Sequence, residues 1–345
     1  MPLVDVIIPV YNSARYVGQA VASALAQGVD VHVYVVDDGS SDGSLDRVPD
    51  DPRVTKLSQR NLGCSAARNR AIGLGRSPFV AFLDADDYWL EGKLQRQIAA
   101  FDRPAVALSC TDFVDFDEAG VTRASVTETH HPCSGRIIGH LLGENFLKPS
   151  TVVVRRSALP ADGPFDETLR WGEDRDLFYR IAAKHEVAFD PKVLVAVRNH
   201  EANVSRNRIG LNSGMARVTQ RALSWLERPE HRAAARLELG RVYRELGFLQ
   251  STHDLGAALA SYARSLRHGG GARAITGMLK APLRRLLVSP AAEAAARELS
   301  SRFDGPVRVP PPPPAGHARP ASAQAPRPAD AHTSPRAPEV DVAAR

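Results

Sequence analysis

The chain has 345 residues, 43% of them hydrophobic, which is enough for one large or two ordinary domains with packed cores. The formal net charge of +5 is mild and the basic residues alternate with acids, so nucleic-acid binding is not expected, and an anionic ligand or membrane surface is favoured only weakly. No segment supplies the run of about 18 uncharged apolar residues that a membrane-spanning helix needs, and three scattered cysteines do not predict a disulfide framework.

The first half of the chain alternates short apolar runs with amphipathic segments. Strand followed by helix, in repetition, predicts an α/β fold with a mainly parallel sheet that is covered on both faces. Further strands are expected at residues 105–116 and 148–159. The runs that carry the pattern are strands at 4–11, 31–40, 53–59 and 78–84, and helices at 14–28 and 64–75.

The second half becomes helical. Residues 171–191 read as a loop, a helix and a short strand, and residues 232–250 and 254–270 resemble a helical hairpin. In residues 277–287, leucines oppose Lys280, Arg284 and Arg285, which predicts a core-facing helix or, as the second choice, a helix resting on an anionic membrane. Residues after 303 hold about two fifths of the chain's 25 prolines and should be disordered.

Polar residues follow the predicted strands at their carboxyl ends, where open parallel sheets bind ligands. Asp37 and Asp38 could accept hydrogen bonds from a nucleobase or a ribose, and the ring of Tyr11 could lie against the base. The alternative for the two acids is an Asx turn that ends the strand. A GxGxxG loop is missing after the first strand, so a dinucleotide oxidoreductase is disfavoured.

Three carboxylates, Asp84, Asp86 and Asp87, come directly after an apolar strand. Hard oxygens suit Mg²⁺ or Mn²⁺, and such ions usually combine one or two carboxylates with substrate phosphates. Acids at a helix N-terminus are the alternative, which accounts for one or two of the three. We therefore expect a metal that carries a nucleotide diphosphate.

Five segments in this order and spacing resemble an inverting glycosyltransferase of family 2 with the GT-A fold, over roughly residues 3–205. The segments are VIIPVYNSARYVGQAVASALAQ, VVDDGSSDGS, NLGCSAARNRAI, FLDADD and WGEDRDLFYR. The resemblance implies a catalytic domain at residues 1–205, which would be followed by a helical region at 206–303 and the tail at 304–345.

The resemblance also implies roles for individual residues. Pro9, Tyr11 and Asp38 would hold the nucleoside together with Asp37, and Arg68 would lie near the base and phosphates. Asp84, Ala85 and Asp86 match the DXD motif, in which the last Asp binds the metal. Asp174 matches the catalytic base, and Glu173 would lie by the acceptor. His200 follows the last core strand and is a secondary candidate for the metal and diphosphate.

These implications predict a metal-dependent transferase that moves a sugar, most often from UDP in such families, to a hydroxyl of a glycan or lipid-linked glycan, as in cell-surface polysaccharide synthesis. We expect Mn²⁺ or Mg²⁺ as the cofactor. We also expect a cytoplasmic protein, and the sequence leaves open whether it makes peripheral contact with the inner face of the membrane. The alternative is a non-catalytic nucleotide-sugar-binding or scaffold protein that binds partners through its helical region. The sequence leaves open the sugar, the acceptor and the oligomeric state.

Overall fold

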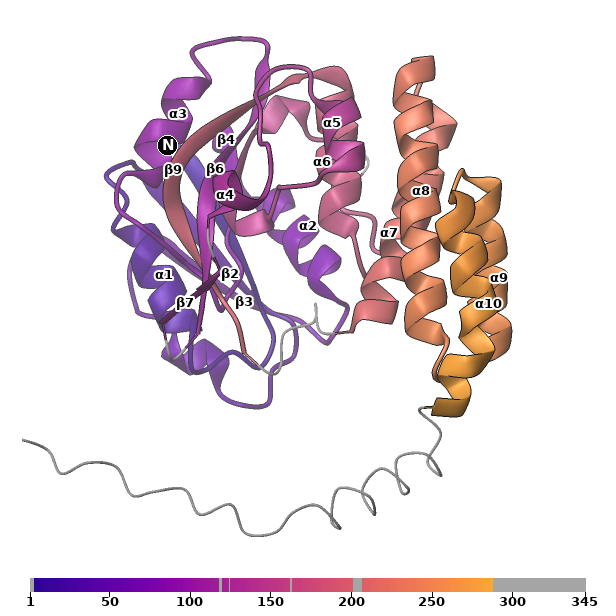
Figure 1. Cartoon of the computed structure of the whole chain (residues 1–345). Coiled ribbons are helices and arrows are strands. Elements are labelled where there is room, and N and C mark those ends of the chain that lie inside the picture. Colours follow the sequence, from indigo (N-terminus) through magenta and orange to yellow (C-terminus); the bar gives the residue numbers. More distant parts are fainter. Residues whose placement is uncertain (1–2, 118–119, 124, 162, 201–206, 288–345) are drawn as a thin grey trace, which may run out of the picture. The chain divides into compact units, whose positions relative to one another are not determined.

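A nine-stranded sheet forms the centre of the protein (Figure 1). The computed structural model describes residues 3–117, 120–123, 125–161, 163–200 and 207–287. The strands follow the order β3-β2-β1-β4-β8-β6-β9-β5, and β7 pairs with β6. Their bounds are β1 (Val4–Val10), β2 (Val31–Asp37), β3 (Val54–Ser58), β4 (Phe79–Phe82), β5 (Tyr88–Trp89), β6 (Val106–Asp117), β7 (Gly120–Arg123), β8 (Val152–Arg155) and β9 (Glu186–Arg198).

The first four strands are parallel, as predicted. β1 pairs with β2 and β4, and β2 pairs with β3. Helices return the chain between them and cover the sheet, with α1 and α3 on one side and α2 and α6 on the other (Figure 1). The helices of this half are α1 (Val17–Leu25), α2 (Cys64–Leu74), α3 (Lys93–Ala100), α4 (Val126–Thr129), α5 (Ile138–Gly143) and α6 (Glu173–Lys184), with single turns η1 (Ser44–Arg47), η2 (Pro149–Thr151) and η3 (Arg156–Ala158).

The remainder of the sheet is mixed. The predicted strands at residues 105–116 and 148–159 are present as β6 and β8, but β8 runs antiparallel to both of its neighbours, β4 and β6. Among the described residues, four of the eight strand pairings are antiparallel, so the sheet is less parallel than expected. The reason is that β8 follows a connection through α4 and α5 instead of one crossover helix, and enters between β4 and β6.

One lysine is fully buried under the sheet. Lys93, in the first turn of α3, donates from Nζ to Gln97 Oε1 at 2.6 Å and lies 4.2 Å from the centroid of the Trp89 ring. Gln97 in turn donates to the carbonyls of Ser109 and Thr151, both at 2.9 Å. Burial holds the pKa of Lys93 well below its usual range.

Four helices follow the sheet in the part of the chain that the structure describes: α7 (Arg208–Trp225), α8 (Pro229–Gln250), α9 (Leu255–Arg267) and α10 (Gly271–Leu287). The predicted hairpin is confirmed as α8 and α9, and α8 also contacts α5, α7 and α10 (Figure 1). The division of the chain at residues 205 and 303 remains a prediction, because both positions, and the whole proline-rich tail, lie outside the described residues.

The preferred prediction for residues 277–287, a helix whose leucines face the core, was wrong. Leu279, Leu283 and Leu286 are exposed, whereas Ala274 and Ala281 are buried on the opposite side of α10. A Cβ at Gly277 would lie 2.4 Å from Tyr262 Cε1 of α9. Small residues thus allow α10 to pack closely on α9, and a leucine face would hold the two helices apart.

Candidate active site

The carboxyl ends of β1, β2 and β4 bring the predicted nucleoside and metal residues to one edge of the sheet. Asp38 N donates to Val10 O at 2.8 Å, and Leu83 N donates to Ile7 O at 3.0 Å, so the three strands remain in register as they end. Tyr11 follows β1 with 54% of its surface exposed. A large, accessible ring at this edge is available to stack on a ligand.

Asp37 and Asp38 are engaged by the chain itself. Asp38 is buried, and its carboxylate accepts hydrogen bonds from Gln59 Nε2, Leu62 N and Gly63 N at 2.9, 2.8 and 2.7 Å. Asp37 accepts from the backbone N–H of Ser40 at 3.2 Å and from its hydroxyl, so its side chain closes a turn three residues on, one residue longer than an Asx turn. Both acids shape the loops around Tyr11, and their direct contact with a nucleoside remains a prediction.

The three carboxylates after β4 have separate partners. Asp84 Oδ1 accepts from Arg68 Nη2 at 2.8 Å, and Asp86 Oδ2 lies 2.9 Å from His200 Nε2. Asp87 is buried and accepts from Ser150 Oγ at 2.6 Å and from Arg198 N at 2.9 Å. The interpretation of all three as charges offset by one metal is therefore corrected. Asp87 is a structural link to the start of β8 and the end of β9.

The pKa values of this cluster reflect crowding. Burial, followed by the charge of Asp84, raises the pKa of Asp86, and the hydrogen bond from His200 opposes the rise. Burial and the charges of Asp86 and Asp84 raise the pKa of Asp87 well above its usual range. An added positive charge near Asp86 would relieve this repulsion.

The fit of a divalent metal can be judged from these contacts. Among the described residues, no group of three or more His, Cys, Asp or Glu side chains could hold a metal ion. Asp86 and His200 nevertheless offer an oxygen and a nitrogen side by side, and neither is fully buried. Asp84 commits Oδ1 to Arg68, which disfavours it as a third ligand. The residues fit a metal that draws its other ligands from substrate phosphates and water.

Arg68 joins the two acidic centres. From α2, it donates through Nη2 to Asp84 and through Nη1 to Glu173 Oε1 at 2.9 Å, and it is only 3% exposed. Its Cζ lies 5.1 Å from the centroid of the Phe165 ring. The predicted place near the base and phosphates is therefore not favoured, since the cation is buried and shared by two carboxylates.

Glu173 and Asp174 open α6, directly after Gly172, which has a positive φ of 81°. Acids are favourable in the first turn, where the free N–H groups of a helix lie. Asp174 Oδ1 accepts from Arg175 N at 2.7 Å. Burial and the neighbouring charge of Asp174 raise the pKa of Glu173, whereas Arg68 lowers it. The two neighbours are thus in different environments.

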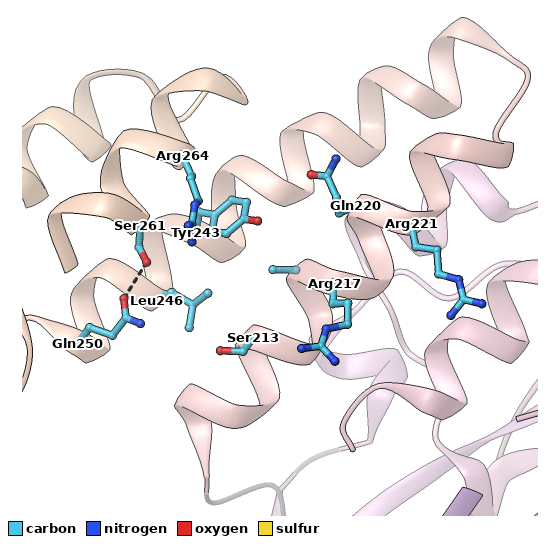
Figure 2. A pocket seen from close by; sticks show the side chains of 10 residues that line it. Ser213, Arg217, Gln220, Arg221, Tyr243, Leu246, Gln250, Ser261 and Arg264 are labelled. Atoms are coloured by element: carbon cyan, nitrogen blue, oxygen red, sulfur yellow. Dashed lines mark hydrogen bonds between the residues drawn. The ribbon is translucent and has the colours of Figure 1, made fainter. Parts of the chain in front are cut away.

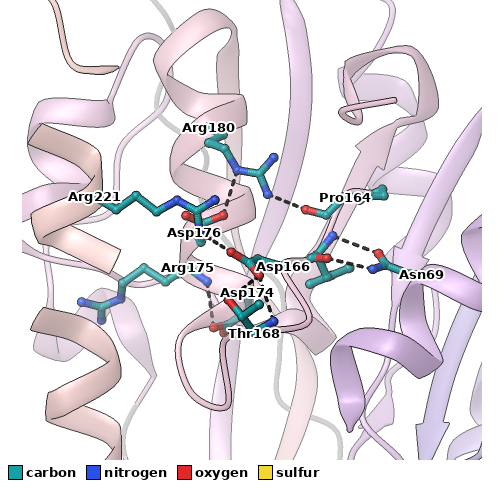
Figure 3. Close-up of polar contacts among 10 residues, drawn as sticks. Asn69, Pro164, Asp166, Thr168, Asp174, Arg175, Asp176, Arg180 and Arg221 are labelled. Atoms are coloured by element: carbon teal, nitrogen blue, oxygen red, sulfur yellow. Dashed lines mark hydrogen bonds and ion pairs between the residues drawn. The ribbon is translucent and has the colours of Figure 1, made fainter. Parts of the chain in front are cut away.

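The loop before α6 is fastened from two sides (Figure 3). Asn69 of α2 donates to Phe165 O at 2.8 Å and accepts from Phe165 N at 2.9 Å. Arg221 of α7 is paired with Asp166. Although burial opposes it, hydrogen bonds from Thr168 and Arg221 lower the pKa of Asp166 to about 2.

Two glycines of α7 complete this support, and the sequence reasoning did not identify them. An added Cβ at Gly214 would lie 2.4 Å from Trp171 O, and one at Gly210 would lie 2.6 Å from Trp171 Cζ2. Trp171 therefore sits against a helix face that only glycine permits. The sequence did contain a signal for this close packing: the two glycines are four residues apart, and that spacing places them on one face of a helix.

A cavity of about 530 Å³ lies elsewhere, between α7, α8 and α9 (Figure 2). Arg217, Tyr243 and Arg264 are among its lining residues, and none of the predicted site residues lines it. The predicted site therefore rests on the sheet edge and not on this cavity.

Comparison with known proteins gives one family. Residues 5–160 match the model of "Glycosyl transferase family 2". The succinoglycan biosynthesis protein ExoU of Rhizobium meliloti is 32% identical over 242 residues, which cover 60% of this chain and 66% of that protein. The alignment therefore leaves about a third of that relative unmatched.

Two solved structures have the same fold. Residues 1–349 of S. aureus TarS, in complex with UDP-GlcNAc, have a TM-score of 0.60 at 18% identity, covering 86% of this chain and 91% of that one. The mannosyltransferase PcManGT from Pyrobaculum calidifontis, in complex with GDP-Man and Mn²⁺, has a TM-score of 0.55 at 18% identity, covering 88% and 85%. The expected fold class is confirmed.

Proposed function

Since the chain belongs, through residues 5–160, to glycosyl transferase family 2, we propose that it moves a sugar from a nucleotide diphosphate donor, UDP in the first instance, to a hydroxyl of a glycan or lipid-linked glycan. The observation that carries the proposal is the meeting of two acidic centres at one sheet edge. The end of β4 supplies Asp84 and Asp86, the start of α6 supplies Glu173 and Asp174, and Arg68 bridges them.

Asp174 is the proposed base. A base needs a carboxylate that can receive a proton, and Glu173 is tied to the buried guanidinium of Arg68. Asp174, by contrast, is half-buried, and the one hydrogen bond it accepts from the described residues is local, from Arg175 N to Oδ1. It would take the proton of the acceptor hydroxyl, whose oxygen attacks the anomeric carbon. The bond from that carbon to the diphosphate breaks, its electron pair leaves with the diphosphate, and the anomeric configuration inverts.

Donor binding would use the strand ends. The exposed ring of Tyr11 would stack on the base, with Pro9 and the loops held by Asp37 and Asp38 beside it. Asp86 and His200 would hold Mn²⁺ or Mg²⁺, which neutralises charge on the leaving diphosphate. Arg68 would position Asp84 and Glu173 and would not contact phosphate.

Thermal unfolding tests both centres in one experiment. The wild type, Asp86→Asn, Asp174→Asn and the exposed control Asp102→Asn are heated with UDP, GDP or ADP, each with and without Mn²⁺. A nucleotide at about 100 times its Kd adds about 2.7 kcal/mol to stability. We expect the metal-dependent shift in the wild type, Asp174→Asn and Asp102→Asn, and its loss in Asp86→Asn.

Release of nucleoside diphosphate from a sugar donor, measured with the same proteins, separates binding from transfer. We expect Asp174→Asn to bind donor and to fail in transfer by at least about a hundredfold, which is the scale of general-base catalysis. Equal turnover in Asp174→Asn refutes the base assignment. Donor binding in the wild type without any turnover would favour a non-catalytic binding protein.

A further inference from the structure

Helix α10 carries an unusual row of exposed apolar side chains. Ile275, Leu279, Leu283 and Leu286 are 50%, 76%, 57% and 69% exposed. Their spacing of four, four and three residues places them along one face of the helix. A soluble surface seldom carries such a row unless the row meets a partner or a membrane.

The exposed row is not the face through which α10 packs on the rest of the protein. The opposite face of α10 already packs against the protein through Ala274 and Ala281, which are fully buried, and Gly277 lies against the ring of Tyr262. The small residues hold α10 in place and leave the larger ones outside. Among the described residues, no helix is long and apolar enough to cross a membrane. The row can therefore lie on a bilayer without spanning it.

Within the stretch of sequence that holds the row, the charged side chains have a single sign. From Leu255 to Ala292 the sequence contains no Asp or Glu. The same stretch carries the basic residues Arg264, Arg267, Arg273, Lys280, Arg284 and Arg285. A helix with an exposed apolar row and basic flanks is suited to an anionic lipid surface.

A second cavity lies beside the basic flank. It measures about 370 Å³ and is lined by Arg244, Arg273, Lys280 and Arg284, together with aromatic side chains. Arg284 Nη1 is buried and has no hydrogen-bond partner among the described residues. Glu245 also lines the cavity but is paired with Arg208. The cavity thus lies among cationic side chains of α8 and α10.

We propose that the α10 face, defined by Ile275, Leu279, Leu283 and Leu286 with its basic flanks, binds the surface of a bilayer that contains anionic phospholipid. The leucines enter the headgroup boundary, and the exposed side chains of Arg273, Lys280 and Arg285 meet lipid phosphates. A second copy of the chain is a poorer occupant, since two such faces would bring like charges together. The binding goes beyond the proposed sugar transfer and does not depend on it.

Vesicle flotation of the full chain tests the proposal. Vesicles of phosphatidylcholine alone are compared with vesicles containing 30% phosphatidylglycerol, at about 50 and 300 mM salt and without nucleotide. We expect binding to the anionic vesicles that weakens with salt. Leu279→Ser with Leu283→Ser should weaken it more than tenfold, and Lys280→Ala or Arg285→Ala by roughly fivefold each at low salt.

Two matched controls and one further measurement complete the test. Leu237→Ser removes an exposed leucine of α8, and Arg217→Ala an exposed arginine of α7; neither should change binding. Equal binding to neutral vesicles, no binding by the full chain, or full binding by the double leucine variant overturns the proposal. So does light scattering that finds a wild-type dimer and a monomeric double leucine variant without lipid.

Discussion

Gly214→Ala tests whether the close contact of α7 with Trp171 supports the candidate active site. The substitution sets the higher helix propensity of alanine against the steric cost of that contact. Alanine favours a helix interior by about 1 kcal/mol over glycine. At Gly214, however, the new Cβ would lie 2.4 Å from Trp171 O and 2.7 Å from Trp171 Cβ. Ordinary contact begins near 3.4 Å, so α7 and the Trp171 backbone must separate by about 1 Å. Such overpacking costs about 1–3 kcal/mol.

The control is Gly73→Ala in α2, where an added Cβ meets no atom within 4 Å. Urea unfolding should find Gly73→Ala more stable than the wild type by about 0.5–1 kcal/mol. Gly214→Ala should be less stable than Gly73→Ala by about 1–3 kcal/mol, which is the cost of overpacking. Because Glu173 and Asp174 follow Trp171 closely, a displacement of about 1 Å should also lower kcat at least tenfold. If the two variants are equally stable and equally active, the support that we assign to Gly214 is refuted.

Two other substitutions test buried charges by urea unfolding. Arg68→Met leaves Asp84 and Glu173 without their cation and should cost about 3–5 kcal/mol at pH 7; the deficit should shrink toward pH 5, because the pKa of Glu173 rises further and protonation removes the unpaired charge. Arg70→Met, on the exposed side of α2, is its control, and a deficit independent of pH would contradict the explanation. Lys93 binds its proton more weakly when folded, so wild-type stability should gain from this residue as pH rises from 7 toward its unfolded pKa of about 10.4. Lys93→Met should lose that gain and the exposed control Lys192→Met should keep it; parallel pH curves for Lys93→Met and the wild type would exclude a neutral buried lysine.

The sequence carried enough information to predict the strands that present the site. Apolar runs ending in Tyr11, Asp38 and Asp84 identify β1, β2 and β4 because burial on both faces demands near-continuous hydrophobic residues. The meeting of their ends then follows from parallel pairing. The helices α8 and α9 could also be predicted from their periodicity.

The partners of individual charges could not be predicted in the same way. Asp87 accepts hydrogen bonds from Ser150 Oγ and from the backbone N–H of Arg198, which lie 63 and 111 residues away in the sequence. The outward orientation of Leu279 depends on how closely Gly277 approaches Tyr262. The sequence pattern shows which residues share one face of a helix. Which of the faces is buried depends on packing against segments that are distant in the sequence.

The shared guanidinium of Arg68 links the two ends of the site thermodynamically. One cation pairs with Asp84, on the proposed donor side, and with Glu173, on the proposed acceptor side, so a ligand that draws Arg68 toward Asp84 should leave Glu173 with a greater affinity for a proton. Reciprocity requires that protonation of Glu173 in turn strengthens the hold of Arg68 on Asp84. In the proposed mechanism, donor binding beside Asp84 and the protonation of Glu173 are therefore one coupled equilibrium, which runs through a single side chain.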